Sequence, residues 1–178
     1  MSDTPLDPRY PIGKFEPRPF SEKRLKEWIN DIRYLPSELE EAIINLDEAQ
    51  LDMPYREGGW KIKQVVHHVA DSHMNAYCRF RLGLTEDNPA IKPYKEQLWA
   101  ELKDSETVPI NISITLLHAL HVRWYETLKN ISGEGWNRTV FHPGQQKSIS
   151  LWNLLGSYAW HGKHHTAHIT HAELGNKR

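Results

Sequence analysis

Four long segments of the chain carry apolar residues at helical spacing, and no other feature of the sequence restricts the fold as much. The first segment begins after Ser21, a residue type that caps helix N-termini, with Glu22 just inside the helix. Pro36 is expected to kink or interrupt this segment, which then resumes through Leu46. The other three segments are expected at about residues 60–84, 111–130 and 151–174, the last after a cap at Ser150. In a chain of 178 residues, four such helices predict an all-α protein folded as an antiparallel four-helix bundle.

The segments outside these helices are expected to be mostly irregular. Residues 1–20 contain five prolines and predict an extended arm that lies on the domain. Residues 94–103 predict a short helix, and residues 133–148 predict a small β-hairpin with a turn at Pro143. We find no internal repeat and no alternation of strands and helices typical of a parallel sheet. Residues 1–178 are therefore expected to form a single domain, with residues 1–20 as its arm.

The charge and cysteine content exclude several classes of partner. The formal net charge is −1, so we expect neither nucleic acid nor a membrane surface as a partner and instead expect a small-molecule substrate. The first twenty residues hold no apolar run typical of a secretory signal, and no stretch is apolar enough to span a bilayer. Cys78 is the single cysteine, which is compatible with a reducing compartment such as the cytoplasm. We expect Cys78 to be a small core residue.

Five of the eleven histidines lie in the last predicted helix. At about 100° per residue, His165 falls in the middle of the apolar stripe and His161 at its edge, one turn away. These two side chains can therefore reach one ion together. His168 lies further from the stripe, which makes His165 with His168 the second choice. His164 and His171 lie furthest from it and are expected in solvent.

Two imidazoles rarely hold a transition metal without a third ligand, so another helix must contribute one. The segment 60–84 offers His67, His68 and His73. The less charged surroundings of His68 favour it over His67 only weakly, while His73 fits a buried, hydrogen-bonded histidine at least as well. Three histidines without a fourth protein ligand leave one position open for water or substrate, as in catalytic zinc sites.

No residue stands out as a general base. The zinc-protease motif HExxH places a glutamate directly after its first histidine, but here Gly162 follows His161. Asp71 and Glu173 are the remaining candidates for orienting a histidine or accepting a proton. Each also fits an ordinary surface charge on an amphipathic helix.

Several segments resemble a known family. The run WKIKQVVHHV at residues 60–69 is similar to the second-helix motif of the DinB-like superfamily, and WHGKHH at 160–165 fits its last-helix motif. The arm YPIGKFEPRPF, the segment QLDMPYREGGW and the run VVHHVADSHMNAYCRFRL closely resemble the YfiT subfamily of metal-dependent hydrolases. This resemblance extends over nearly the whole chain.

The resemblance implies a four-helix bundle that holds zinc, or alternatively nickel, through His68, His161 and His165. It also implies a cytoplasmic protein, commonly a homodimer. Some relatives are thiol transferases that join a low-molecular-weight thiol such as bacillithiol to electrophiles, which gives a second hypothesis beside hydrolysis. A third hypothesis is a non-catalytic metal-binding protein of the stress response. Ligation by nitrogen alone leaves zinc, nickel and manganese open and disfavours calcium and magnesium, which prefer oxygen.

Overall fold

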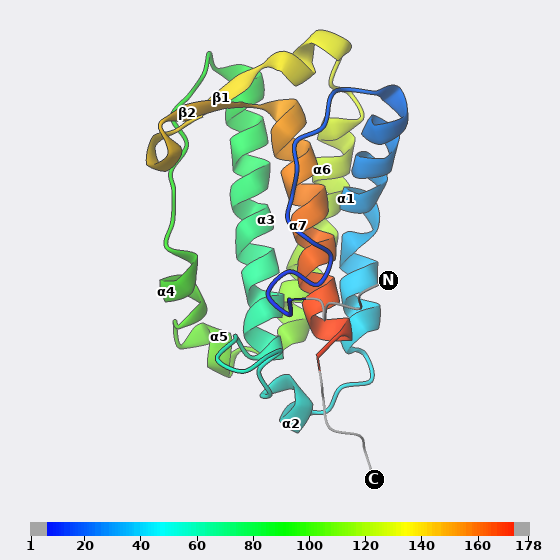
Figure 1. Ribbon diagram of the computed structural model, residues 1–178, viewed down its shortest axis with the longest axis vertical. Coiled ribbons are helices and arrows are strands. Elements are labelled where there is room, and N and C mark those ends of the chain that lie inside the picture. The colour runs from blue at the N-terminus through cyan, green and yellow to red at the C-terminus, as the bar shows by residue number, and fades with distance from the viewer. Residues whose placement is uncertain (1–6, 173–178) are drawn as a thin grey trace.

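The computed structural model describes residues 7–172, in which four long helices form a bundle (Figure 1). The side chain of Ser21 accepts a hydrogen bond from the backbone N–H of Arg24, and Ser150 does the same for Asn153. The predicted all-α bundle and both serine caps are therefore confirmed. The long helices are α1 (Glu22–Ile43), α3 (Ile62–Thr85), α6 (Ile110–Leu128) and α7 (Leu151–Thr170).

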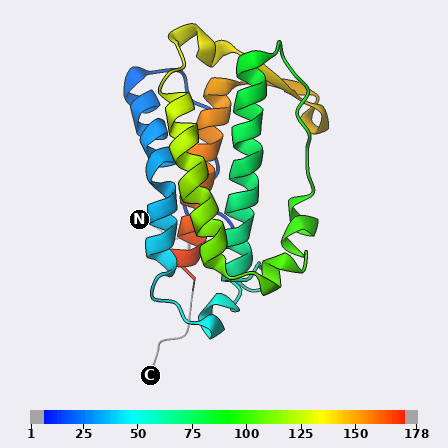
Figure 2. The same ribbon diagram turned by 180° about the vertical axis from the view of Figure 1, so that it is seen from behind.

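The four helices run in two directions. Figures 1 and 2 show α1 and α7 running one way and α3 and α6 the other. Both α1 and α3 pack against α6 and α7, so α1 and α3 lie diagonally across the bundle from each other. The neighbours α1 and α7 are thus parallel, whereas α3 and α7 are antiparallel. This arrangement brings the middle of α3 against the middle of α7.

A long connection between α3 and α6 lies along one flank of the bundle. Because these two helices point the same way, the chain must return along their whole length before α6 begins (Figure 2). The connection contains α4 (Glu96–Ala100), which confirms the predicted short helix, and α5 (Asp104–Thr107), which was not predicted. Both short helices contact α3. Another short helix, α2 (Glu48–Leu51), lies between α1 and α3 and starts with a capping box at Asp47.

A kink or an interruption was predicted at Pro36; helix α1 continues through this residue, so the interruption is wrong. Proline has no N–H to donate to the carbonyl four residues earlier, which here belongs to Ile32. That carbonyl instead accepts a hydrogen bond from the Nδ1–H of His121 on α6. A neighbouring helix thus replaces the hydrogen bond that proline removes.

The predicted hairpin and arm are both present. Strands β1 (Thr139–His142) and β2 (Lys147–Ser150) pair antiparallel, with 3-10 helices at Gly133–Asn137 and Pro143–Gln145. The described part of the arm, residues 7–20, has no helix or strand and passes along α7 (Figure 1). Its carbonyls at Gly13 and Arg18 accept hydrogen bonds from the indole N–H groups of Trp160 and Trp152. The arm therefore covers a face of the last helix.

The core consists of two apolar clusters along the bundle, with histidines between them. One cluster is built around Phe80, Trp124 and Leu155, and the other around Leu39, Val65 and Leu117. On α3, α6 and α7 the positions between the clusters hold His73, His121, His161 and His165. Within residues 7–172, no helix is both long and apolar enough to cross a membrane.

Candidate metal centre

His68 on α3 and the pair His161 and His165 on α7 come together at mid-bundle. One ring nitrogen from each lies within 4.8 Å of the other two. The Nε2 atoms of His68 and His161 are 3.2 Å apart. On α7 the spacing of four residues puts both side chains on one face, and the antiparallel packing of α3 presents His68 to that face. The three residues named in the sequence prediction are therefore brought together.

The spacing of two of these imidazoles fits a transition metal. With Zn–N distances of about 2.0–2.1 Å and tetrahedral angles, two ligand nitrogens lie about 3.3 Å apart. The observed 3.2 Å between His68 Nε2 and His161 Nε2 agrees with this value. Three imidazoles without a carboxylate suit zinc, nickel or another transition metal rather than calcium or magnesium.

Burial keeps the three rings in the form that binds metals. His68 and His165 are buried and His161 is partly buried. Removal from water lowers the pKa of His68 to about 4 and lowers the pKa of His161 and His165 well below the usual value. All three are therefore neutral at physiological pH, with lone pairs free for a metal.

The other histidines of α3 take different positions. His67 points away from the group, with its ring nitrogens 2.8 Å from Ser113 Oγ and 3.1 Å from the carbonyl of Val108. The structure thus separates two neighbours that helical phase distinguished only weakly. His73 is fully buried, and its ring nitrogens lie within hydrogen-bond distance of His121 and His161. This agrees with the expectation of a buried, hydrogen-bonded histidine.

The expectation that His164 lies in solvent is wrong, because only 6% of its surface is exposed. Helical phase pointed it away from the bundle, but Tyr10 of the arm lies 6.0 Å from its ring, and Trp160 of α7 itself stacks on it at 4.4 Å. The arm also covers His168, whose Nε2 is 3.3 Å from the carbonyl of Arg9. His171 is exposed, as expected.

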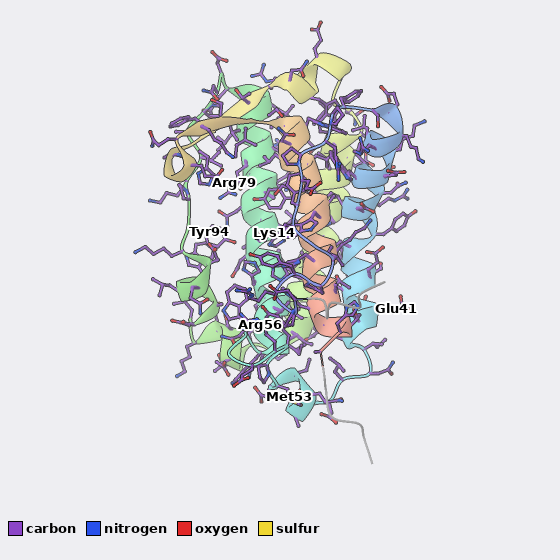
Figure 3. The ribbon with its side chains drawn as sticks, viewed as in Figure 1. Lys14, Glu41, Met53, Arg56, Arg79 and Tyr94 are labelled. Atoms are coloured by element: carbon purple, nitrogen blue, oxygen red, sulfur yellow. The ribbon has the colours of Figure 1, made fainter. Side chains whose placement is uncertain are left out.

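A cavity of about 640 Å³ opens beside the three histidines. Its walls combine aromatic rings with a few polar groups, as small-molecule sites do. Figure 3 labels Arg79 on α3 and Tyr94 on the connection after it, and both lie on the same flank of the bundle. The guanidinium of Arg79 donates to the hydroxyl of Tyr158 at 2.7 Å. Beside the three histidines, the lining includes Trp60, Arg79, Tyr94, Glu96 and Tyr158.

Sequence reasoning missed most of this lining, although one signal was present. Arg79 lies eleven residues after His68, which places it only about 20° away around the helix. Tyr94 reaches the site because the connection folds back along α3, and no local pattern indicates that course. The position of His121 beside His73 depends likewise on which helices are neighbours.

Neither proposed general base lines the cavity among the described residues. Asp71 is half-buried elsewhere on α3, where burial and the charge of Asp104 raise its pKa to about 6. Glu173 lies outside the described residues. Cys78 is exposed, so the expectation that it is a core residue is wrong. Among the described residues that line the cavity, Glu96 is the one that carries a carboxylate.

A four-helix bundle that gathers histidines from two facing helices beside a cavity is the architecture of a helical-bundle metal protein. Comparison with known families agrees with this class. The chain belongs to the DinB superfamily, whose model matches residues 31–169.

Individual relatives extend the similarity over almost the whole chain. A protein of Bacillus cereus (strain 03BB102) named "Putative metal-dependent hydrolase" is 53% identical over 165 residues, which is 92% of this chain and 94% of the relative. A protein of Bacillus thuringiensis subsp. konkukian (strain 97-27), also named as such a hydrolase, matches to the same extent. Identity of this extent places the chain in the same family as these relatives.

Two solved structures resemble the bundle. YfiT from Bacillus subtilis, described as a probable metal-dependent hydrolase with an unusual four-helix bundle topology, aligns with a TM-score of 0.89 and 47% identity over 92% of this chain and 94% of its own. The mycothiol-dependent maleylpyruvate isomerase aligns with a TM-score of 0.62 and 16% identity over 80% of this chain and 59% of its own. The second likeness concerns the fold alone.

Proposed function

We propose that this protein is a metal-dependent hydrolase that acts on a small molecule bound beside His68, His161 and His165. One observation carries the proposal: three neutral imidazoles converge at the wall of a cavity of about 640 Å³. The names of the Bacillus relatives, which describe metal-dependent hydrolases, support the same function. Zinc is the proposed ion, with nickel and manganese as alternatives.

Held by His68, His161 and His165, a transition metal would supply a Lewis acid to polarise a scissile carbonyl and to lower the pKa of a water molecule. The chain itself binds and orients the substrate. Arg79 places a cation in the cavity wall, where it can pair with an anionic group of the substrate. Burial raises the pKa of Tyr94 to about 12, so at neutral pH its hydroxyl keeps its proton and can donate a hydrogen bond.

A second candidate is a metal-dependent thiol S-transferase that joins a bacillithiol-like thiol to an electrophile. It is favoured by the absence of Asp71 from the described cavity lining, because a metal can deprotonate a thiol without a protein base. The mycothiol-dependent maleylpyruvate isomerase shows only that the fold is compatible with this candidate.

Turnover assays separate these candidates. The metal-free protein, the zinc-loaded protein and the zinc-loaded His161→Ala variant are incubated with a panel of ester and amide substrates without thiol. Hydrolysis that is seen with the zinc-loaded native protein, and with neither the metal-free protein nor the His161→Ala variant, supports the proposal. Parallel reactions with monochlorobimane test for conjugation that requires both metal and an added thiol.

The outcomes are distinct. Conjugation of the thiol without any hydrolysis would contradict the proposed hydrolase and support the thiol transferase. Metal binding without either reaction would favour the non-catalytic stress-response protein. Homodimerisation, cytoplasmic location and the single domain stay predictions, of which the first is measurable by light scattering.

A further inference from the structure

A line of hydrogen-bonded groups crosses the bundle and uses one residue from each long helix. It begins at the carbonyl of Ile32 on α1, which contacts Nδ1 of His121 on α6. His121 Nε2 is 3.0 Å from Nδ1 of His73 on α3. His73 Nε2 is 3.3 Å from Nδ1 of His161 on α7. The line ends at a candidate metal ligand.

The carbonyl at one end sets the direction of every hydrogen bond in the line. A carbonyl can only accept, so His121 must carry its proton on Nδ1, and in the neutral ring its Nε2 then accepts. His73 must therefore donate from Nδ1 and accept at Nε2. By the same step, His161 donates from Nδ1, which leaves the lone pair on its Nε2. This is the atom that lies 3.2 Å from His68 Nε2.

We propose that His73 and His121 are positioning residues that hold His161 as the Nδ1–H tautomer and direct its Nε2 lone pair at the metal. This inference rests on the metal site of the proposed function. Histidine ligands commonly donate their second N–H to a partner that fixes the ring orientation. Here the partner is a histidine whose own tautomer is fixed by another histidine and a backbone carbonyl.

The surroundings keep this line intact. His73 is 0% exposed and His121 is 2% exposed, so bulk water has little access to compete for their ring nitrogens. The rings of His73 and His121 are nearly coplanar, with planes 13° apart and centroids 5.0 Å apart, as their hydrogen bond requires, and Trp124 and Tyr158 pack edge-on against His73. The carbonyl of Ile32 is available because Pro36 cannot donate to it.

His165 has a shorter line of the same kind. His168 Nε2 lies 3.3 Å from the carbonyl of Arg9, and His168 Nδ1 lies 3.3 Å from Nδ1 of His165. The carbonyl again accepts, so His168 donates from Nε2 and accepts from the Nδ1–H of His165. This leaves the Nε2 lone pair of His165 free. Both candidate ligands on α7 are thus the same tautomer.

The tautomers can be read directly by long-range ¹⁵N–¹H NMR of the native, metal-free protein labelled at its histidines. We expect Nδ1–H tautomers for His73, His121 and His161. An Nε2–H tautomer at His73 or at His161 would overturn the proposal. This measurement needs no variant and no activity.

Variants test whether the line matters for metal binding. The affinity for Co²⁺ and Zn²⁺ is measured by competition with a chelator, together with the visible spectrum of the Co²⁺ form. His73→Leu removes the acceptor for His161, and we expect affinity to fall about 10- to 100-fold with a changed Co²⁺ spectrum. His73→Gln restores an oxygen acceptor and is expected to recover much of that loss.

His67→Leu is the matched control, because His67 is a buried histidine of the same helix with two hydrogen bonds that lead away from the site. We expect it to bind metal as the native protein does. Equal losses in His67→Leu and His73→Leu, or no loss in His73→Leu, would overturn the proposal. If His73→Leu does not fold, the native tautomers decide. A native protein with the expected tautomers but no metal affinity would refute the metal site and leave the hydrogen-bond line standing.

Discussion

The histidines of α7 are closely spaced, yet each has its own surroundings. His161 and His165 point toward His68 on α3, whereas His164 stacks under Trp160. His168 stacks on Tyr55 at 4.0 Å. Neighbouring segments, rather than the histidines themselves, therefore decide which rings can share a metal.

Alanine at His161 or His165 is expected to lower bound transition metal from about one ion per chain to nearly none, because two imidazoles bind far more weakly than three. Mass spectrometry of metals in the purified variants measures this. His171→Ala is the matched control, since His171 is an exposed histidine at the end of the same helix. Full metal content in both ligand variants would contradict the assignment.

The direction in which a single side chain points was predictable where it depends only on the position of the residue around its own helix. The spacing of His161 and His165 put both on the apolar side, and the structure places both there. The choice between His67 and His68 was nearly open, because it depends on the direction in which α3 faces α7. The burial of His164 was not foreseen, because part of it comes from Tyr10 on an arm more than 140 residues earlier in the chain.

Close contact between parallel helices depends on two glycines of α7. A Cβ at Gly156 would lie 2.5 Å from the ring of Trp28, and one at Gly162 would lie 2.8 Å from Leu35. Both contacts are with side chains of α1. Glycine thus lets α1 approach α7 near the candidate site.

Gly156→Ala is expected to destabilise the protein by about 1–3 kcal/mol, because the rigid indole of Trp28 must move. Urea denaturation followed by far-UV circular dichroism gives the free energy of unfolding. Gly133→Ala serves as control, since a Cβ there meets no atom within 4 Å, and we expect a change within about 0.5 kcal/mol. Equal effects of the two substitutions would show that α1 and α7 tolerate the added methyl group.

The arm is expected to stabilise both the bundle and the site. A chain shortened to begin at residue 20 loses the carbonyls that pair with Trp152, Trp160 and His168. We expect a lower melting temperature and weaker metal affinity, measured by thermal unfolding and chelator competition. Arg9→Ala keeps the backbone carbonyl and removes only an exposed ion pair with Asp7, so it should behave as the native protein. Native metal affinity in the shortened chain would contradict a role of the arm at His165.

Helices and caps were predictable because their signals are local. Ser21 and Ser150 cap the helices that their positions indicated. The interruption predicted at Pro36 does not occur, because a residue of another helix replaces the missing hydrogen bond. The parallel pairing of α1 with α7 has no local signal, since it follows from the long connections.

Buried neutral histidines make the stability of the whole molecule dependent on pH. Burial lowers the pKa of His68 and of His121 from 6.5 to about 4. Between these values the unfolded chain binds more protons than the folded one, so stability is fully present above about pH 6.5 and is lost as the pH falls toward 4. Asp71 acts in the opposite sense, because its pKa is raised to about 6. Several histidines have a lowered pKa and Asp71 is a single opposing group, so the histidines determine the direction of the pH dependence.

Metal-free protein is therefore expected to be less stable at pH 5 than at pH 7, by about 2 kcal/mol for each histidine held neutral. Urea denaturation at both pH values measures the difference. A His121→Asn variant should lose part of this dependence, since one buried imidazole is absent. Equal stability at the two pH values would contradict the neutral state of these rings.

The arm also has a consequence for the order of events during synthesis. Residues 9, 13 and 18 leave the ribosome 134 to 159 residues before their partners on α7, which are His168, Trp160 and Trp152. These contacts therefore cannot form until α7 has been synthesised. The arm therefore docks only after α7 is present, and His165 receives the hydrogen bonds that run through His168 to the carbonyl of Arg9 at that stage.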